Sequence, residues 1–259
     1  MLDIDVERRF GGVRRLYGEA SLAKFKAAHV CVIGIGGVGS WAVEALARSS
    51  VGKITLIDLD NIAESNVNRQ LHAVEDNFGK AKVSAMHERV MQINPLCKVI
   101  EIEECITLAN VSSLLNHIDF VLDATDDVKA KIALAHYCKL QTIPLVMVGG
   151  AGGRLDPTRM RIADLSLVTG DKLLAKVRSG LRRDHQFPKA QHNKKSTKFF
   201  IQTIYSDELV IKPDAACETD VLTGLNCAGY GSSVCVTAPF GFAAASLILQ
   251  AILNNQSGL

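Results

Sequence analysis

Short apolar runs alternate with segments of helical periodicity over the first 150 residues of the chain. Runs of four or five residues rich in valine and isoleucine predict buried strands, whereas apolar residues that recur every 3.6 positions predict amphipathic helices. Strands are expected at 29–33, 53–57, 99–102, 120–123 and 144–148, and helices at 40–50, 80–93, 110–116 and 129–139. Because strands that alternate with helices form parallel sheets, residues 29–150 are predicted to be a Rossmann-like, doubly wound half.

The pattern is less regular after residue 150. A helix is expected at 172–183, strands at 199–205 and 209–211, and polar loops at 184–198 and 213–233. A short apolar stretch after Thr158 is compatible with one more strand, and residues 1–28 form a helical, polar lead-in. The predicted fold is a single α/β domain over residues 1–259. It is Rossmann-like and doubly wound with a mostly parallel sheet, and residues 151–259 add a C-terminal α+β portion.

The last apolar run, 234–253, is long enough to cross a bilayer. It contains Pro239 and Gly241, however, and no aromatic or basic anchors flank its end. We therefore expect a buried core helix of about 13 residues that starts after the Pro-Phe-Gly-Phe stretch, because proline interrupts a helix interior. No stable membrane association is expected.

The net charge and the cysteine spacing bear on whether the chain binds nucleic acid, forms disulfides or binds zinc. The net charge of +2 does not by itself indicate a nucleic-acid-binding chain. None of the seven cysteines forms a CxxC pair, so neither a disulfide framework nor a structural zinc site is expected. The N-terminus does not resemble a signal peptide, and a cytoplasmic location is expected.

A glycine-rich turn follows the first predicted strand. Gly34, Gly36, Gly37 and Gly39 form a GxGGxG motif that opens a helix, where glycines let the backbone approach a phosphate. Asp58 lies 19 residues after Gly39, at the end of the second strand, where an acid can bind a ribose hydroxyl pair. The two features together predict a nucleotide site.

The polar stretch after Asp58 argues against an NAD-dependent dehydrogenase. It offers Asn66, Arg69 and Gln70, and Lys82 follows near the start of a helix. Two cations that converge on phosphates suit phosphoryl or nucleotidyl transfer, because charge builds on phosphate oxygens during that reaction. Asp126 and Asp127 follow the fourth strand, where a carboxylate can bind Mg²⁺ or can cap the next helix. The sequence leaves these two roles open.

These motifs, taken in order, resemble the ubiquitin-activating-enzyme superfamily, whose bacterial members adenylate sulfur-carrier proteins. Asp-x-Asp at Asp58 and Asp60, Ser-Asn-x-Asn-Arg-Gln, Gly-Lys-Ala-Lys and Asp-x-x-Asp extend the match to about residue 127. The resemblance implies an ATP site that comprises Gly34, Gly36, Gly37, Gly39, Asp58, Asp60, Asn66, Arg69, Gln70, Lys82 and Asp126. It implies catalytic roles for Arg69, Lys82 and Asp126, Mg²⁺ on Asp126, a homodimer, and an arginine, matched by Arg9, that enters the neighbouring subunit's site.

A second resemblance covers most of the chain. The Arg9-Phe-Gly-Gly start, Gly149-Gly-Ala-Gly-Gly-Arg, Asn226-Cys227-Ala-Gly-Tyr-Gly and the absence of CxxC pairs are similar to the tRNA threonylcarbamoyladenosine dehydratases. That family uses ATP and Mg²⁺ to activate the threonyl carboxylate of a modified adenosine in tRNA, which then cyclises with net loss of water. A sulfur-relay protein is a further partner to consider, and residues 151–259 would form the substrate and dimer portion.

A basic segment at 171–198 is consistent with this resemblance. It holds nine Lys/Arg residues and two acids, a net charge of +7. A solvated surface is the common meaning of such a run, but a tRNA substrate favours phosphate contacts. The candidate contacts are Lys176, Arg178, Arg182, Arg183, Lys194 and Lys195. Cys227 is a candidate reactive thiol, and its alternative role is that of a small residue in a tight loop.

Three other functions remain alternatives at this point. Adenylation of a ubiquitin-like sulfur carrier predicts an essential Cys227. A redox enzyme predicts a response to NADH. A scaffold without activity conflicts with the presence of every phosphate-binding residue type in the nucleotide motifs.

Overall fold

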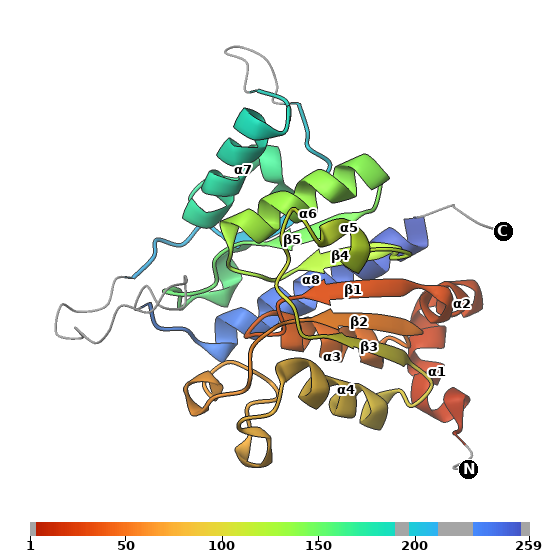
Figure 1. Cartoon of the computed structure of the whole chain (residues 1–259). Helices are drawn as coiled ribbons and strands as arrows, with labels where there is room; N and C mark the ends of the chain where they lie inside the picture. The colour runs from red at the N-terminus through yellow and green to blue at the C-terminus, as the bar shows by residue number, and fades with distance from the viewer. Residues whose placement is uncertain (1–3, 190–196, 212–229, 255–259) are drawn as a thin grey trace.

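A single seven-stranded sheet crosses the molecule (Figure 1). The computed structural model describes residues 4–189, 197–211 and 230–254. The strand order is β3-β2-β1-β4-β5-β7-β6, and β6 alone runs antiparallel to its neighbour among the strands described. The strands are β1 (His29–Ile33), β2 (Lys53–Ile57), β3 (Lys98–Ile102), β4 (Phe120–Asp123), β5 (Leu145–Val148), β6 (Met160–Asp164) and β7 (Gln202–Ser206). The predicted doubly wound, mostly parallel α/β fold is confirmed.

Helices cover both faces of this sheet. The helices are α1 (Val6–Tyr17), α2 (Glu19–Ala27), α3 (Gly39–Arg48), α4 (Lys82–Ile93), α5 (Val111–Leu114), α6 (Val128–Gln141), α7 (Lys172–Asp184) and α8 (Val234–Asn254). Short 3₁₀ turns occur at Glu64–Asn66, Glu75–Asn77, Pro157–Arg159 and Leu165–Leu167. One buried cluster joins α3, α4 and α8 to the sheet, and a second joins α5, α6 and α7.

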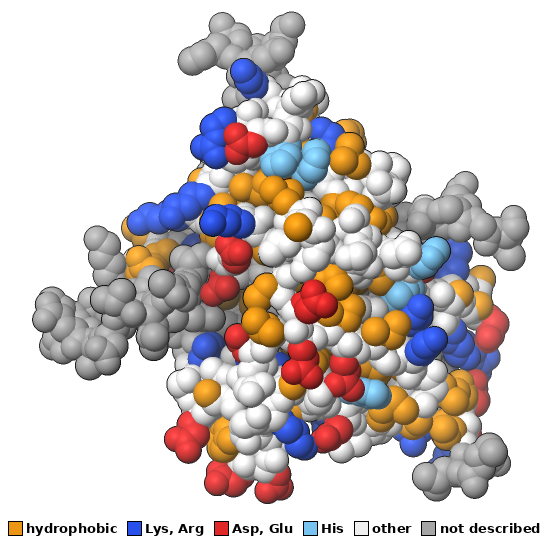
Figure 2. Space-filling view, in the orientation of Figure 1, with side chains coloured by type: hydrophobic (Ala, Val, Ile, Leu, Met, Phe, Trp, Pro, Cys, Tyr) orange, Lys and Arg blue, Asp and Glu red, His pale blue; other side chains and the backbone are white. Residues whose placement is uncertain are grey.

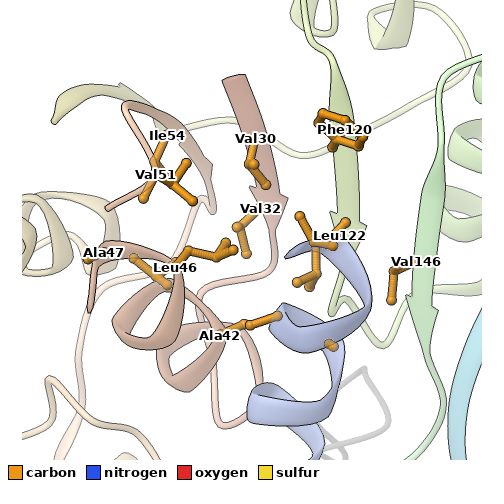
Figure 3. Close-up of a cluster of buried hydrophobic side chains, with 14 of the residues drawn as sticks. Val30, Val32, Ala42, Leu46, Ala47, Val51, Ile54, Phe120, Leu122 and Val146 are labelled. Carbon is orange, nitrogen blue, oxygen red and sulfur yellow. The ribbon is translucent and has the colours of Figure 1, made fainter. Parts of the chain in front are cut away.

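Alternation along β1 builds these two clusters. Val30 and Val32 pack toward α3 and α8 (Figure 3). Cys31 and Ile33 belong to the other cluster, which contains α6. Successive side chains of a strand point to opposite faces, so a strand buried on both sides is apolar throughout. This explains why the first strand appears in the sequence as an uninterrupted apolar run.

The topology places a crevice at one end of the sheet. From β1 the chain passes to β2 on one side, and β4 lies on the other side. The strand order therefore reverses between β1 and β4, and ligands of open α/β sheets bind outside the carboxyl ends of the strands at such a point. The loops after Ile33, Ile57 and Asp123 meet there.

The final helix is longer than predicted. It has 21 residues, Val234–Asn254, and Pro239 lies inside it. Phe240 and Gly241 are buried against α3, and a Cβ on Gly241 would lie 2.4 Å from the Val38 carbonyl oxygen. Close packing on α3 stabilises the early turns despite the proline. The helix is long and apolar enough to cross a membrane, and one side of it packs into the core as predicted.

The predicted strand at 209–211 is wrong. The segment leaves the sheet after β7 and bonds instead to the glycine-rich loop, where the Ile211 amide donates to the Gly153 carbonyl. Arg154, buried beside this segment, donates to the Glu208 carbonyl. The sheet edge beyond β7 is already filled by β6. The predicted strand after Thr158 is confirmed as β6.

Candidate functional site

The GxGGxG turn connects β1 to α3 at the crevice. Gly34 has a φ of +83°, and a Cβ there would lie 2.8 Å from the Ala124 backbone. A Cβ on Gly39 would lie 1.9 Å from the Gly34 carbonyl oxygen. Only glycine fits these two positions, and the turn leaves the N-terminus of α3 facing the crevice. Unpaired N–H groups and the helix dipole make such an end an anion site.

Asp58 is held beside this turn by backbone donors. Its carboxylate accepts hydrogen bonds from the amides of Ile35 at 2.6 Å and Asp60 at 2.9 Å. The Lys82 ammonium lies 2.6 Å from the Asp60 carboxylate and 3.7 Å from that of Asp58. Burial raises the pKa of Asp58, and Lys82 and the two amides oppose that rise. Lys82 is the first residue of α4, and its side chain is buried. The structure thus brings three predicted residues together.

The 64–70 loop covers the other side of the glycine turn. The side chain of Arg69 packs over Gly37, where a Cβ would lie 3.0 Å from Arg69 Cγ. Its guanidinium donates to the Ser65 carbonyl and the Asn68 amide oxygen. Burial lowers the pKa of Arg69, and the charge of Asp126 opposes that change. Arg69 thus packs against Gly37, whereas the loop that carries Asp126 packs against Gly34.

Asn66 and Gln70 have different surroundings in the same loop. The Asn66 amide oxygen accepts a hydrogen bond from the Ala63 amide and so helps to form a local turn. Gln70 is buried near Gly36, and its amide oxygen has no hydrogen-bond partner among the described residues. A buried acceptor without a partner is costly, so Gln70 is available to a donor that enters the site.

The two neighbouring acids after β4 have separate roles. Asp127 caps α6, because its carboxylate accepts a hydrogen bond from the Lys129 amide. Asp126 is exposed and makes no hydrogen bond or ion pair within the described ranges. Those ranges contain no cluster of three or more metal-ligating side chains. One carboxylate beside a phosphate site still fits Mg²⁺, which commonly binds one or two carboxylates, substrate phosphates and water.

A buried ion pair under this loop escaped prediction. The Lys131 ammonium lies 3.1 Å from the Asp123 carboxylate and donates to the Val148 carbonyl at 2.7 Å. Asp123 also accepts from the Thr125 amide and hydroxyl. The pair joins the ends of β4 and β5 and fixes the loop that carries Asp126. Lysine side chains are mostly exposed, so the sequence gives no signal that this one is buried.

His72 is the second buried polar group that escaped prediction. Neither ring nitrogen has a hydrogen-bond partner among the described residues. Burial, with a smaller contribution from Lys82, lowers the pKa of His72 to about 4. His72 is therefore a neutral ring behind the Lys82–Asp58 pair at physiological pH.

Arg9 lies outside the site of its own chain. Its guanidinium donates to the carbonyls of Gln92 and Ile93 at the end of α4. Lys82 stands at the start of that 12-residue helix, about 16 Å away at 1.5 Å per residue. Any contact of Arg9 with ATP therefore requires a second copy of the chain.

The basic candidates on α7 divide into two groups. Arg178 donates to the Leu165 and Val168 carbonyls, and Arg182 donates to the Pro188 carbonyl, so both support the fold. Lys176 and Arg183 are exposed. Figure 2 shows Lys and Arg side chains gathered over α7, with acidic side chains beneath them in this view. Lys194, Lys195 and Cys227 lie outside the described residues.

Comparison with known proteins gives consistent matches. A protein-family model described as the ThiF family matches residues 12–257. The tRNA threonylcarbamoyladenosine dehydratase of Haemophilus influenzae is 48% identical and covers 97% of this chain and 95% of its own length. The tRNA threonylcarbamoyladenosine dehydratase of Escherichia coli is 44% identical, and the match covers 95% of this chain and 94% of that protein. The molybdopterin-synthase adenylyltransferase of Haemophilus influenzae is 29% identical over 61% of this chain and 68% of its own length.

Solved structures support the same relationship. The crystal structure of E. coli tRNA N6-threonylcarbamoyladenosine dehydratase in complex with ATP superposes with a TM-score of 0.86 at 42% identity. The match covers 98% of this chain and 97% of that chain. The complex of the same protein with AMP gives the same values.

Proposed function

The chain belongs to the ThiF family and, within it, to the tRNA threonylcarbamoyladenosine dehydratases, and from this premise we propose how its site performs the reaction. The enzyme binds ATP, as its similarity to an ATP complex over nearly the whole chain supports. It transfers the adenylyl group of ATP to the threonyl carboxylate of threonylcarbamoyladenosine in tRNA, and pyrophosphate leaves. A nitrogen or oxygen of the modification then attacks the activated carbonyl, AMP leaves, and the substrate has lost one water.

The residues of the crevice have different roles in this reaction. The glycine turn and the N-terminus of α3 hold phosphate oxygens, and Asp58 holds the ribose. Arg69 and Lys82 offset charge on the leaving phosphates, and Gln70 and Asn66 line the same site. Mg²⁺ on Asp126 would supply further positive charge to the phosphates. No covalent enzyme intermediate is required, so alignment of the carboxylate with the α-phosphate is the main demand on the protein.

The remaining expectations form part of the same proposal. The enzyme is a cytoplasmic homodimer, in which Arg9 leaves the end of α4 and enters the partner's ATP site. Residues 151–259 form the substrate and dimer portion, and the basic segment contacts tRNA. Cys227 is not needed for the proposed chemistry, and a sulfur-relay protein is an auxiliary partner at most.

The glycine turn, packed between the Arg69 side chain at Gly37 and the loop that carries Asp126 at Gly34, is the single observation that carries the proposal, because it leaves a cation and a carboxylate-bearing loop beside the helix N-terminus where phosphates would lie. The test is AMP release from labelled ATP with Mg²⁺, with modified tRNA compared against an unmodified transcript. We expect AMP only with the modified tRNA, and a nucleoside lighter by the mass of one water. AMP formation that ignores the modification would contradict the proposal.

Adenylation of a sulfur carrier is the second candidate for the same fold. The similarity to molybdopterin-synthase adenylyltransferase covers about three fifths of the chain and is lower than the similarity to the dehydratases. Pyrophosphate exchange that depends on a ubiquitin-like protein, without AMP release on tRNA, would favour this candidate.

A further inference from the structure

A groove between α6 and α7 begins next to the candidate active site. It measures about 420 Å³ and is lined by Val128, Ile132, Ala175, Lys176, Ser179, Gly180 and Arg183. This volume lies within the usual range for small-ligand sites. Val128 is the first residue of α6 and stands two residues after Asp126. The two Cα atoms are at most about 8 Å apart, so the groove and the active site are neighbours.

The floor and the rim of the groove differ in chemistry. The floor is apolar, with Val128, Ile132 and Ala175 on facing helices. The helices are in close contact at Gly180, where a Cβ would lie 2.4 Å from Ile132 Cδ1. The rim carries Lys176, Ser179 and Arg183, all exposed and on one side of α7. One wall therefore suits a flat apolar ring, and the other suits an anion.

The rim cations are available to a ligand. Arg183 pairs with Asp184 through two contacts of 2.8 Å, and its side chain is 75% exposed. Such surface pairs contribute about 1 kcal/mol or less, so a phosphate can displace Asp184. Lys176 forms no ion pair in the described part of the chain. Arg178 and Arg182 are already bound to backbone carbonyls and do not compete.

We propose that this groove binds one nucleotide of the tRNA that adjoins the modified adenosine. Its phosphate contacts Lys176 and Arg183, and its base lies on the Val128–Ile132–Ala175 floor. This inference rests on the proposed tRNA substrate. Single-stranded RNA offers exposed bases next to phosphates, and proteins bind such bases through apolar or stacking surfaces. A purely apolar ligand would not use the two cations, whereas a nucleotide uses both walls.

Two kinds of variant separate the base from the phosphate. In the full chain, Lys176→Glu combined with Arg183→Glu reverses the rim charge, and Ser179→Trp fills the groove without changing charge. Lys26→Glu, an exposed charge reversal on α2, is the control. Each variant is assayed for ATP affinity, thermal unfolding, and the Kd and KM for an anticodon stem-loop that carries the modification. Ser179→Leu replaces Ser179→Trp if the latter does not fold.

We expect both groove variants to weaken stem-loop binding about tenfold or more, because each loses a charge-assisted contact or the base site. ATP affinity should stay within about twofold of the wild type, because the ATP-binding residues are unchanged. The free modified nucleoside, which lacks the neighbouring nucleotide, should bind all variants alike.

Three results would overturn the inference. If Ser179→Trp binds like the wild type, the groove holds no base, even if the charge reversal weakens binding. If the charge reversal costs no more than Lys26→Glu, the rim holds no phosphate. If an acidic peptide competes with the stem-loop better than an oligonucleotide does, the groove binds protein. Failure of the wild-type enzyme to release AMP on modified tRNA would instead reject the proposed function itself.

Discussion

The Lys82 ammonium lies 2.6 Å from the Asp60 carboxylate and 3.7 Å from that of Asp58, with Lys82 and Asp58 both largely buried. Lys82 therefore serves two purposes. It offsets the buried charge of Asp58, and it is available to phosphates when a nucleotide binds. Removing it leaves Asp58 with two backbone donors in the described part of the chain.

Lys82→Met should make stability more dependent on pH. Burial already raises the pKa of Asp58 above its unfolded value, and loss of Lys82 raises it further. An acid with a raised folded pKa contributes its stability below the unfolded pKa and loses it as pH rises through the folded pKa. The variant should therefore lose more of its Tm between pH 4 and pH 7.5 than the wild type does.

A matched control for this prediction lies two residues away. Lys80→Met breaks an exposed pair with Glu88 and a hydrogen bond to Asn77, and it should leave both the pH dependence and the ATP-induced rise in Tm unchanged. Lys82→Met should also reduce the ATP-induced rise. An unchanged rise in Lys82→Met would show that Lys82 does not contact the nucleotide.

Many residues of this site could be predicted from the sequence, because they lie where predicted strands end. The positions of Gly34, Asp58 and Asp126 depend on where three apolar runs stop, and those runs are visible in the pattern. The sequence could not tell which of Asp126 and Asp127 caps α6, since either acid can occupy that position. It also gave no sign of the Lys131–Asp123 pair or of the orientation of His72. Contacts between distant segments decide whether a buried polar side chain finds a partner.

Asp126 and Asp127 should separate activity from stability. Asp126→Ala should reduce AMP formation about a hundredfold or more, because the proposal places its carboxylate beside the phosphates, and should leave unfolding unchanged, because its side chain is exposed. Asp127→Ala should lose about 1 kcal/mol of stability with the α6 cap and should retain activity at saturating ATP. Urea unfolding and AMP release measure the two effects. The reverse pattern would assign the catalytic role to Asp127.

Arg69→Ala should resemble Asp126→Ala, with lost AMP formation and a folded protein. Among the described residues its guanidinium bonds to Ser65 and Asn68 of its own loop, so removal leaves no described buried charge without its partner. ATP binding measured by calorimetry should weaken, because Arg69 offsets phosphate charge. AMP formation at the wild-type rate would remove Arg69 from the catalytic set.

Lys131→Met should be strongly destabilising, because it leaves the Asp123 carboxylate buried without its cation. Breaking a fully buried pair in this way costs about 3–5 kcal/mol. Asp123→Leu with Lys131→Met should recover part of that loss, since apolar replacements of a buried pair are often tolerated. Denaturant unfolding measures both. Equal stability of Lys131→Met and the wild type would mean that the ion pair does not hold the loop.

His72 should make the protein sensitive to acid. Its pKa is lowered to about 4 from 6.5, mainly by burial and further by Lys82. A base with a depressed folded pKa contributes stability above its unfolded pKa and loses it as pH falls through the folded pKa. The free energy of unfolding should therefore fall by about 3 kcal/mol between about pH 6.5 and pH 4 because of this one group. Within this pH range the buried ring stays neutral in the folded state but becomes protonated in the unfolded state. Replacing His72 with a neutral side chain should therefore remove this pH dependence.

The measurement is urea unfolding of the wild type and His72→Gln at pH 7.5 and pH 5. The wild type should lose more stability than the variant between these two values. The cluster of Glu101, His87 and Ser84 lies elsewhere on the fold and is the same in both proteins. An identical loss in the two proteins would mean that His72 is not held neutral.

Phe200→Gly should stabilise the protein although it removes a large side chain. Phe200 has a φ of +61° and is 84% exposed, and its amide donates to the buried Asp164 carboxylate. Glycine adopts this left-handed backbone without strain, which should stabilise the variant by about 1–2 kcal/mol. Glycine also gives the unfolded chain more conformational entropy, which should destabilise the variant by only about 0.4–1 kcal/mol. Leu209, 86% exposed and without positive φ, is the control, and Leu209→Gly should destabilise because only the entropy change remains. If thermal unfolding shows the same loss for both variants, backbone strain at Phe200 is negligible.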